Sequence, residues 1–177
     1  MNDLNQADKA LGKLTDVRII YLPPAAVAAS HFIGDEPEAV AGGRIMEFAR
    51  ARNIAAIKPD VRMYGFNHPN PVDETNAHGY EFWLTIPDDM DVPPPLIKKR
   101  FEGGLYAAHM IRMGDFQEWQ WLDDWVKASE EYEYRGSGSQ ENMCDMLEEH
   151  LNLYTHLVEG EDDGFMQLDL LIPVRKK

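Results

Sequence analysis

Residues 80–87 carry the side chains whose types and spacing best suit ligand chemistry. β-Branched and aromatic residues lie here between a glycine and a proline, a composition typical of a β-strand. Because side chains alternate between the two faces of a strand, the even-numbered residues would face a core, while Glu81, Trp83 and Thr85 share the other face. A carboxylate beside an indole suits a pocket for a flat cation, and the cation–π contact would contribute about 0.5–2 kcal/mol. The alternatives are that Glu81 is an exposed strand residue or is already paired with an arginine.

Three further groups of residues could contribute chemistry, and each also has a purely structural interpretation. Tyr64 and Phe66 share one face of an earlier strand and would either extend the aromatic wall or pack within the sheet. The tryptophans at 119, 121 and 125 have helical spacing, for which a role in the core is the better interpretation. The Leu-Glu-Glu-His run at 147–150 could act in acid–base chemistry, although an exposed strand is favoured.

No pattern in the sequence indicates a metal, a cofactor or a covalent nucleophile. The six histidines lack the spacing of metal ligands on one element. Cys144 lies among carboxylates, which disfavour the reactive thiolate. The sequence also contains no glycine-rich phosphate loop and no Gly-x-Ser-x-Gly motif. We therefore expect no cofactor and no metal, and we name no catalytic residue.

The charge balance argues against several classes of partner. The 177 residues include 31 acidic and 17 basic side chains, which gives a net charge of −14. Binding to nucleic acids or to anionic membranes depends on clustered Lys and Arg, so we expect neither partner. A single cysteine excludes an internal disulfide, and the polar N-terminus lacks the apolar run of a signal peptide, so we expect a cytoplasmic protein. The length fits one domain at residues 15–177, after an N-terminal arm at 1–14.

Local patterns predict an α+β protein. Helices are expected at 36–52 and about 116–126, where apolar residues recur at helical spacing. Residues 129–142 are charged and rich in Gly and Ser, which predicts a mobile loop. Residues 146–153 fit a strand or a helix by periodicity alone. Strands are expected at residues 17–22, 27–33, 61–66, 80–86, 97–101, 105–112 and 165–174.

An internal repeat divides the domain into two halves, at about 15–90 and 95–175. Residues 34–38 match 114–118, and the alanine pairs at 28–29 and 107–108 match in the same order. Residues 82–87 match 168–173, which equates Glu81 with Gln167 and Trp83 with Asp169. The sequence of each half predicts the element order strand–turn–strand–helix–strand–strand. We therefore expect two pseudo-symmetric strand–helix–strand–strand modules whose antiparallel sheets pair about a pseudo-twofold axis. Helices would cover one face of the sheets, and the opposite face would form a groove lined by these four residues.

Five motifs in order resemble the GyrI-like effector-binding family, the small-molecule domain of AraC-type and MerR-type multidrug-responsive regulators. The motifs are Tyr64-Gly65-Phe66-Asn67-His68-Pro69-Asn70-Pro71, Gly79-Tyr80-Glu81-Phe82-Trp83, Phe101-Glu102-Gly103-Gly104-Leu105-Tyr106-Ala107, Leu147-Glu148-Glu149-His150-Leu151-Asn152 and Leu168-Asp169-Leu170-Leu171-Ile172-Pro173-Val174. The resemblance covers about residues 15–175. It implies the same two-module fold and a groove that binds lipophilic, often cationic compounds through acidic and aromatic residues. That role carries over most directly to Glu81, with Trp83 and Tyr64 as walls. Gln167 stands where the second half of many relatives carries Glu, although Asp169 lies nearby.

The leading hypothesis is a stand-alone binding protein for small hydrophobic, cationic, drug-like ligands. Only about 15 residues precede the domain, too few for a DNA-binding helix-turn-helix module. Two alternatives come from the resemblance: a GyrI-like hydrolase of reactive electrophilic compounds with Glu81 as general base, and an inhibitor that binds a protein partner. The expected ligand-binding residues are Glu81, Trp83, Tyr64, Phe66, Gln167 and Asp169.

Overall fold

The computed structural model describes residues 16–71, 78–159 and 166–177, so the arm predicted at 1–14 lies outside the described residues. All the strands and both helices expected from the sequence are present, and the ambiguous segment at 146–153 contains a strand. In chain order the elements are β1 (Arg18–Leu22), β2 (Ala25–Ile33), α2 (Pro37–Ala51), α3 (Ile54–Ile57), β3 (Met63–Asn67), β4 (Gly79–Ile86), β5 (Ile97–Phe101), β6 (Gly104–Arg112), α4 (Glu118–Ala128), β7 (Tyr132–Tyr134), the 3₁₀ helix η1 (Gln140–Asp145), β8 (Leu147–His150), α5 (Leu153–Glu159) and β9 (Gln167–Lys176).

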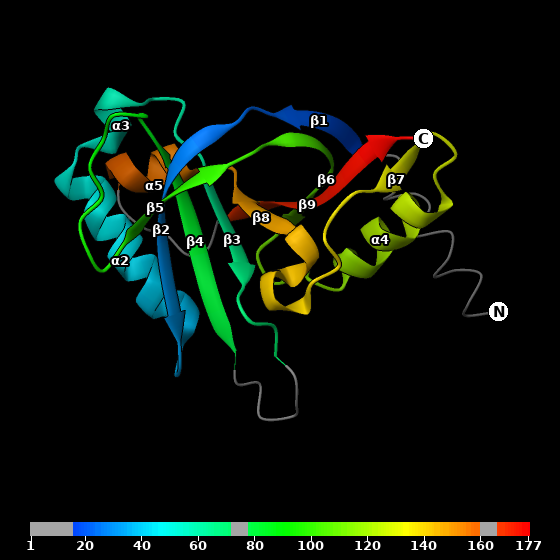
Figure 1. Cartoon of the computed structure of the whole chain (residues 1–177), viewed down its shortest axis with the longest axis horizontal. Helices are drawn as coiled ribbons and strands as arrows, with labels where there is room; N and C mark the ends of the chain where they lie inside the picture. Colours follow the sequence, from blue (N-terminus) through cyan, green and yellow to red (C-terminus); the bar gives the residue numbers. More distant parts are fainter. Residues whose placement is uncertain (1–15, 72–77, 160–165) are drawn as a thin grey trace.

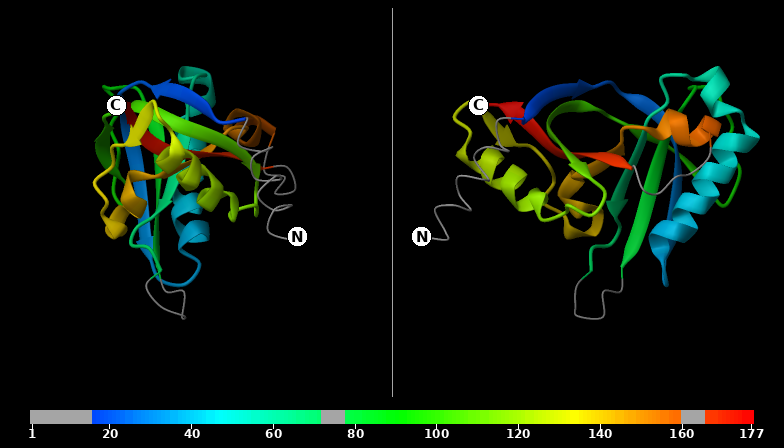
Figure 2. Two further views of the ribbon diagram at one scale, coloured as in Figure 1. Left: turned by 90° about the vertical axis from the view of Figure 1, so that its right-hand side faces the viewer. Right: turned by 180° about the vertical axis from the view of Figure 1, so that it is seen from behind.

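The strands form one curved antiparallel sheet, which confirms the predicted α+β architecture of two similar modules (Figure 1). Its order is β1-β6-β9-β8-β3-β4-β2-β5, with β7 paired to β9. β3 and β8 pair at the centre and join the two halves. Helix α2 packs on β2 and β4, whereas α4 packs on β6 and β9. The two helices therefore stand at opposite ends of the molecule, with the central strands between them (Figure 2).

The outermost strands are exchanged between the halves, which the repeat did not predict. β1 pairs with β6 of the second half, and β5 pairs with β2 of the first half. The register is continuous across both pairs, since Arg18 pairs with Ala108 and Ala29 pairs with Ile97. The segments at 23–24 and 102–103 are therefore bends within two long strands and not hairpin turns. Gly103 has a φ of +65°, and a Cβ there would lie 2.2 Å from a main-chain oxygen, so the bend requires glycine.

Three apolar clusters stabilise this arrangement. One lies between α2 and the first half of the sheet, and another between α4 and the second half. The third lies on the sheet face opposite these helices and contains aromatic side chains from both halves, including Tyr64, Phe66, Phe101 and Tyr106. Apolar side chains therefore cover both faces of the sheet, so a binding site on either face would have an apolar lining.

The region at 129–142 differs from its prediction. A mobile loop was expected, but residues 132–134 form β7 and pair with β9, from Tyr132 opposite Lys176 to Tyr134 opposite Val174. The prediction is therefore wrong for these residues, because the pairing with a distant strand is absent from the local composition. Among the described residues, no helix is long and apolar enough to cross a membrane.

Candidate functional site

Two hollows lie on opposite faces of the sheet. The larger, which we call the helix-side cavity, has a volume of about 1100 Å³ and lies between α2 and α4 over the central strands. The smaller, which we call the far-face pocket, has a volume of about 390 Å³ and lies among β3, β4, β5 and η1. Strand alternation separates them, since Tyr80, Phe82 and Glu148 line the cavity whereas Glu81, Trp83 and Leu147 line the pocket.

The helix-side cavity is acidic and apolar. Its described lining contains the carboxylates of Glu38, Asp123 and Glu148 but no lysine and no arginine. Aromatic walls come from Tyr80, Phe82, Phe116 and Trp119. Flexible thioether side chains complete the lining, at Met46, Met63, Met113, Met143, Met146 and Met166. This combination is suited to an apolar guest with a positive charge.

Glu148 on β8 is the most deeply placed of these carboxylates. The Tyr80 hydroxyl donates a hydrogen bond of 2.6 Å to its Oε2 atom, and Trp119 provides a second side-chain hydrogen bond. Burial raises the pKa of Glu148 in spite of these two bonds, and the nearby Glu38 carboxylate raises it further. Burial also raises the pKa of Tyr80 well above its ordinary value, so the hydroxyl stays a proton donor. Among the described residues, no cation forms an ion pair with Glu148.

His150 lies two residues along the same strand and also lines the cavity. Its ring stands edge-on to Phe82, with 5.8 Å between the ring centroids. Burial lowers the pKa of His150 to about 4, and the neighbouring His156 lowers it further, so this imidazole is neutral at pH 7. The side chain therefore adds an aromatic wall to the cavity without adding a positive charge.

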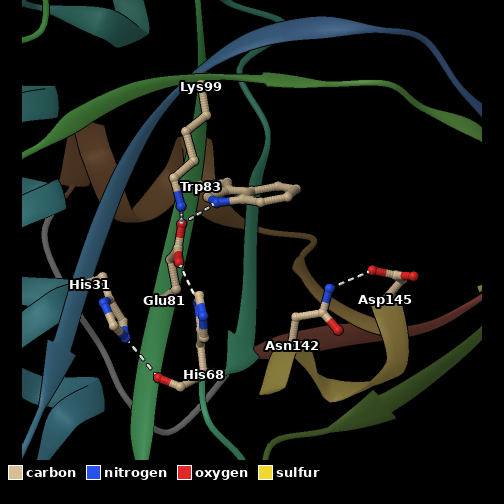
Figure 3. Close-up of polar contacts among 7 residues, drawn as sticks. All are labelled: His31, His68, Glu81, Trp83, Lys99, Asn142 and Asp145. Carbon is tan, nitrogen blue, oxygen red and sulfur yellow. Dashed lines mark hydrogen bonds and ion pairs between the residues drawn. The ribbon is translucent and has the colours of Figure 1, made fainter. Parts of the chain in front are cut away.

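Glu81, the leading candidate from the sequence, is fully buried and already has partners (Figure 3). Lys99 Nζ lies 2.5 Å from its Oε1 atom, and Trp83 Nε1 donates to the same oxygen over 2.6 Å. His68 Nδ1 lies 2.7 Å from the Oε2 atom. Burial alone would raise the pKa of Glu81, but the bonds from Lys99, Trp83 and His68 outweigh it and lower the pKa. Glu81 therefore fits the alternative in which this carboxylate is already paired within the protein, except that its partner is a lysine and not an arginine.

The remaining predicted residues are only partly brought together. Phe66 packs edge-on against Trp83 at 5.0 Å and lines the far-face pocket with it. Tyr64 is buried beneath the pocket wall, and Gln167 is exposed at the start of β9. Asp169 is buried and paired with Arg18, so it is not among the residues that line the pocket.

The strand register changes how the two halves correspond. Ala29 pairs with Trp83, and Ala108, its counterpart in the repeat, pairs with Leu171. Trp83 therefore corresponds to Leu171, and Glu81 corresponds to Asp169. The sequence alignment that equated Glu81 with Gln167 is wrong by two residues, because Pro87 follows the end of β4 whereas Pro173 lies within β9.

Each corresponding carboxylate is paired with a cation from an exchanged strand. Lys99 on β5 contacts Glu81, and Arg18 on β1 contacts Asp169. Burial raises the pKa of Asp169, although Arg18 opposes the shift. In each pair the carboxylate is buried and the cation is partly exposed, and the pair attaches an outer strand to the other half, which is a structural role.

The comparisons with known proteins agree with this fold. Residues 18–174 match the family model of integron-associated effector binding proteins, so the chain belongs to this family, and the GyrI-like resemblance is confirmed. No curated protein sequence matches the chain.

Solved structures with the same fold share little sequence with this chain. The C-terminal domain of EcmrR superposes with a TM-score of 0.61 at 12% identity, covering 91% of this chain and 98% of that domain. EcmrR in its complex with DNA gives a TM-score of 0.63 at 12% identity, covering 99% of this chain but only 63% of that one. An uncharacterised conserved protein from Listeria innocua gives 0.60 at 13% identity, covering 90% of this chain and 92% of that one. At these identities the likeness concerns the fold alone.

Proposed function

We propose that this effector-binding protein takes up small hydrophobic cations in the helix-side cavity, with Glu148 as the counter-ion. The observation that carries the proposal is the composition of the cavity, whose described lining has three carboxylates and no lysine or arginine. Glu38 is bonded to His78 and Asp123 is paired with Lys127, so Glu148 is the one of the three with no cationic partner among the described residues. A cation that enters such a cavity gains a partner for its charge, whereas an anion would be desolvated beside like charges.

The environment of Glu148 supports this choice of counter-ion. Its raised pKa means that the ionised carboxylate lacks a compensating cation within the protein. A bound cation supplies that partner, and the faces of Trp119 and Tyr80 beside it can add cation–π contacts of about 0.5–2 kcal/mol. The methionine lining adapts to guests of different shape, so we expect a range of related cations to bind.

Crystal violet and its uncharged leuco form test the proposal, because they share three aromatic rings and differ in charge. We expect the wild-type protein to bind the cation more tightly than the leuco form in an equilibrium titration. Glu148→Gln keeps the side-chain volume but removes the charge, and should weaken crystal violet by roughly 10- to 100-fold.

Glu81→Gln is the matched control, because it removes a carboxylate from the opposite face of the sheet. Its affinity for crystal violet should equal that of the wild type. A loss confined to Glu81→Gln would instead support the site predicted from the sequence, and equal affinities in all three proteins would contradict a role for either carboxylate. The fold of each variant is verified by circular dichroism.

Hydrolysis of reactive electrophilic compounds is a second candidate function of the same cavity. Catalysis by a general base is most efficient when the pKa of the base lies near the working pH, which favours Glu148 with its raised pKa over Glu81 with its lowered one. Turnover of an electrophilic cyclopropane by the wild type and not by Glu148→Gln would favour this function, and binding without turnover would favour the first.

A further inference from the structure

We propose that the far-face pocket is a second binding site, for an uncharged aromatic molecule that carries a hydrogen-bond acceptor. The pocket opens on the face of the sheet opposite the helix-side cavity, and its volume of about 390 Å³ lies within the range of roughly 300–1,000 Å³ typical of ligand sites. Both halves build it, with β4 and β5 on one side and η1 with the start of β8 on the other. Of the lining residues drawn in Figure 3, Glu81, Trp83 and Lys99 lie on one side, and Asn142 and Asp145 lie on the other.

A row of aromatic rings forms the wall of the pocket. Phe66 contacts Trp83 with 5.0 Å between centroids, Trp83 contacts Phe101 at 5.9 Å, and Phe101 contacts Tyr106 at 6.3 Å. Leu147 and Pro173 add apolar surface from the second half. A flat aromatic guest gains favourable edge and face contacts along such a row.

The charges around the pocket are balanced. Three basic side chains, Lys99, Arg100 and Arg135, lie among three acidic ones, Glu81, Glu102 and Asp145. Lys99 pairs with Glu81, and Arg100 pairs with Asp88 outside the pocket. Among the described residues, Arg135 and Glu102 form no ion pair, but their charges are opposite in sign, so the pocket as a whole attracts neither an anion nor a cation. Because burying a charged guest would still cost desolvation, the pocket favours an uncharged guest. The helix-side cavity, whose described lining has three carboxylates and no lysine or arginine, has the opposite preference.

The polar atoms of the pocket offer spare donors. The ammonium of Lys99 carries three N–H groups and the guanidinium of Arg135 carries five. Arg135 donates from Nη2 to the Gly103 carbonyl oxygen and lies over the Tyr106 ring at 5.7 Å. The acceptor Asp145 is already engaged, by the amide of Asn142 and the main-chain N–H of Ser137. An acceptor on the guest would therefore find donors at the wall.

The position of Arg135 is built into the fold. Gly104 has a φ of +125°, and a Cβ at this residue would lie 2.1 Å from Arg135 Nη2. The guanidinium thus occupies space that only glycine leaves open, between the bend at the start of β6 and the Tyr106 ring. This placement holds the spare N–H groups of Arg135 at the end of the aromatic row.

Three naphthalene derivatives of different charge test the proposal: 2-naphthamide, 2-naphthoate and 2-naphthylmethylammonium. Two indole N–H groups serve as separate reporters in a ¹⁵N NMR titration, because Trp83 lines the pocket and Trp119 lines the cavity. Each resonance is assigned with a Trp→Phe variant. We expect 2-naphthamide to shift the Trp83 resonance at about tenfold lower concentration than either charged probe does.

Arg135→Gln should weaken 2-naphthamide by about three- to tenfold, as expected for the loss of one hydrogen-bonding partner. Arg175→Gln is the matched control, because Arg175 lines neither hollow and its guanidinium pairs with Glu133 on the surface, and it should leave the affinity unchanged. Glu148→Gln should also leave it unchanged, so the result is independent of the cation site. The proposal is overturned if 2-naphthamide shifts only Trp119, if a charged probe is preferred at Trp83, or if Arg135→Gln binds as the wild type does.

Discussion

Glu81 and Glu148 are two carboxylates on opposite faces of one sheet, and each is bonded to a tryptophan. Their pKa values nevertheless shift in opposite directions. Glu81 receives hydrogen bonds from Lys99, Trp83 and His68, which together lower its pKa. Glu148 receives bonds only from the neutral donors Tyr80 and Trp119 among the described residues, and burial raises its pKa. A carboxylate near aromatic rings is therefore free to bind an external cation only when the protein supplies no cation of its own.

The largest expected difference between the two carboxylates is in folding stability. Glu81→Gln removes the charge that the partly exposed Lys99 faces, and we expect a loss of about 2 kcal/mol in the free energy of unfolding, measured by urea denaturation. Glu148→Gln should be neutral or stabilising at pH 8. Glu148 holds its proton more tightly in the folded state than in the unfolded state, because its folded-state pKa is raised. Its protonation therefore stabilises the fold at low pH, and this stabilisation is lost as the pH rises through the pKa of the folded state. Equal losses in both variants would contradict the comparison.

The next effect concerns the pH dependence of cation binding. Only the ionised Glu148 attracts a cation, so the affinity for crystal violet should fall as the pH is lowered through its raised pKa. We expect a progressive decrease as the pH is lowered from about 8 toward the ordinary range of a glutamate, measured by dye titration at constant ionic strength. The profile of Glu148→Gln should be flat over the same range. A wild-type profile that is also flat would place the counter-ion elsewhere.

The smallest effect separates the two tryptophans. Trp119→Phe removes one donor from Glu148, which should raise the pKa of this carboxylate and weaken crystal violet by about three- to tenfold at pH 7. Trp83→Phe removes a donor from Glu81 and should instead lower the stability by about 1 kcal/mol without changing the dye affinity. Equal dye affinities in the two variants would argue against the assignment of the cation to the helix-side cavity.

Local sequence patterns were sufficient for the two long helices, for the strands other than β7 and for the two-module plan, but not for α3, β7, η1 and α5. Strand alternation, helical spacing and the repeated Gly-Asp motifs each depend on neighbouring residues, and all of them correspond to observed elements. The exchange of β1 and β5 was not predictable in this way. It depends on pairing between residues far apart in the chain, such as Arg18 with Ala108, 90 positions later, and no local pattern specifies such a partner.

The candidate site shows a similar limit. Glu81 was identified from the residues beside it, but its partner Lys99 comes from β5, whose place next to β2 was not foreseen. Tyr80 was assigned to the core face of β4. Part of that face does pack into a core, but α2 and α4 stand apart, and the part of the face between them lines the helix-side cavity. Glu148 stands next to another glutamate, and composition alone cannot tell which of the two faces the cavity.

The exchange of the outer strands ties the first half of the chain to the second. If the chain segments before and after residue 90 were to separate, β1 would leave β6 and β5 would leave β2, and the Arg18–Asp169 and Lys99–Glu81 pairs would break. The same linkage means that cutting the chain between β4 and β5 would leave two fragments that each need the other to complete a sheet, so they should reassociate into one molecule.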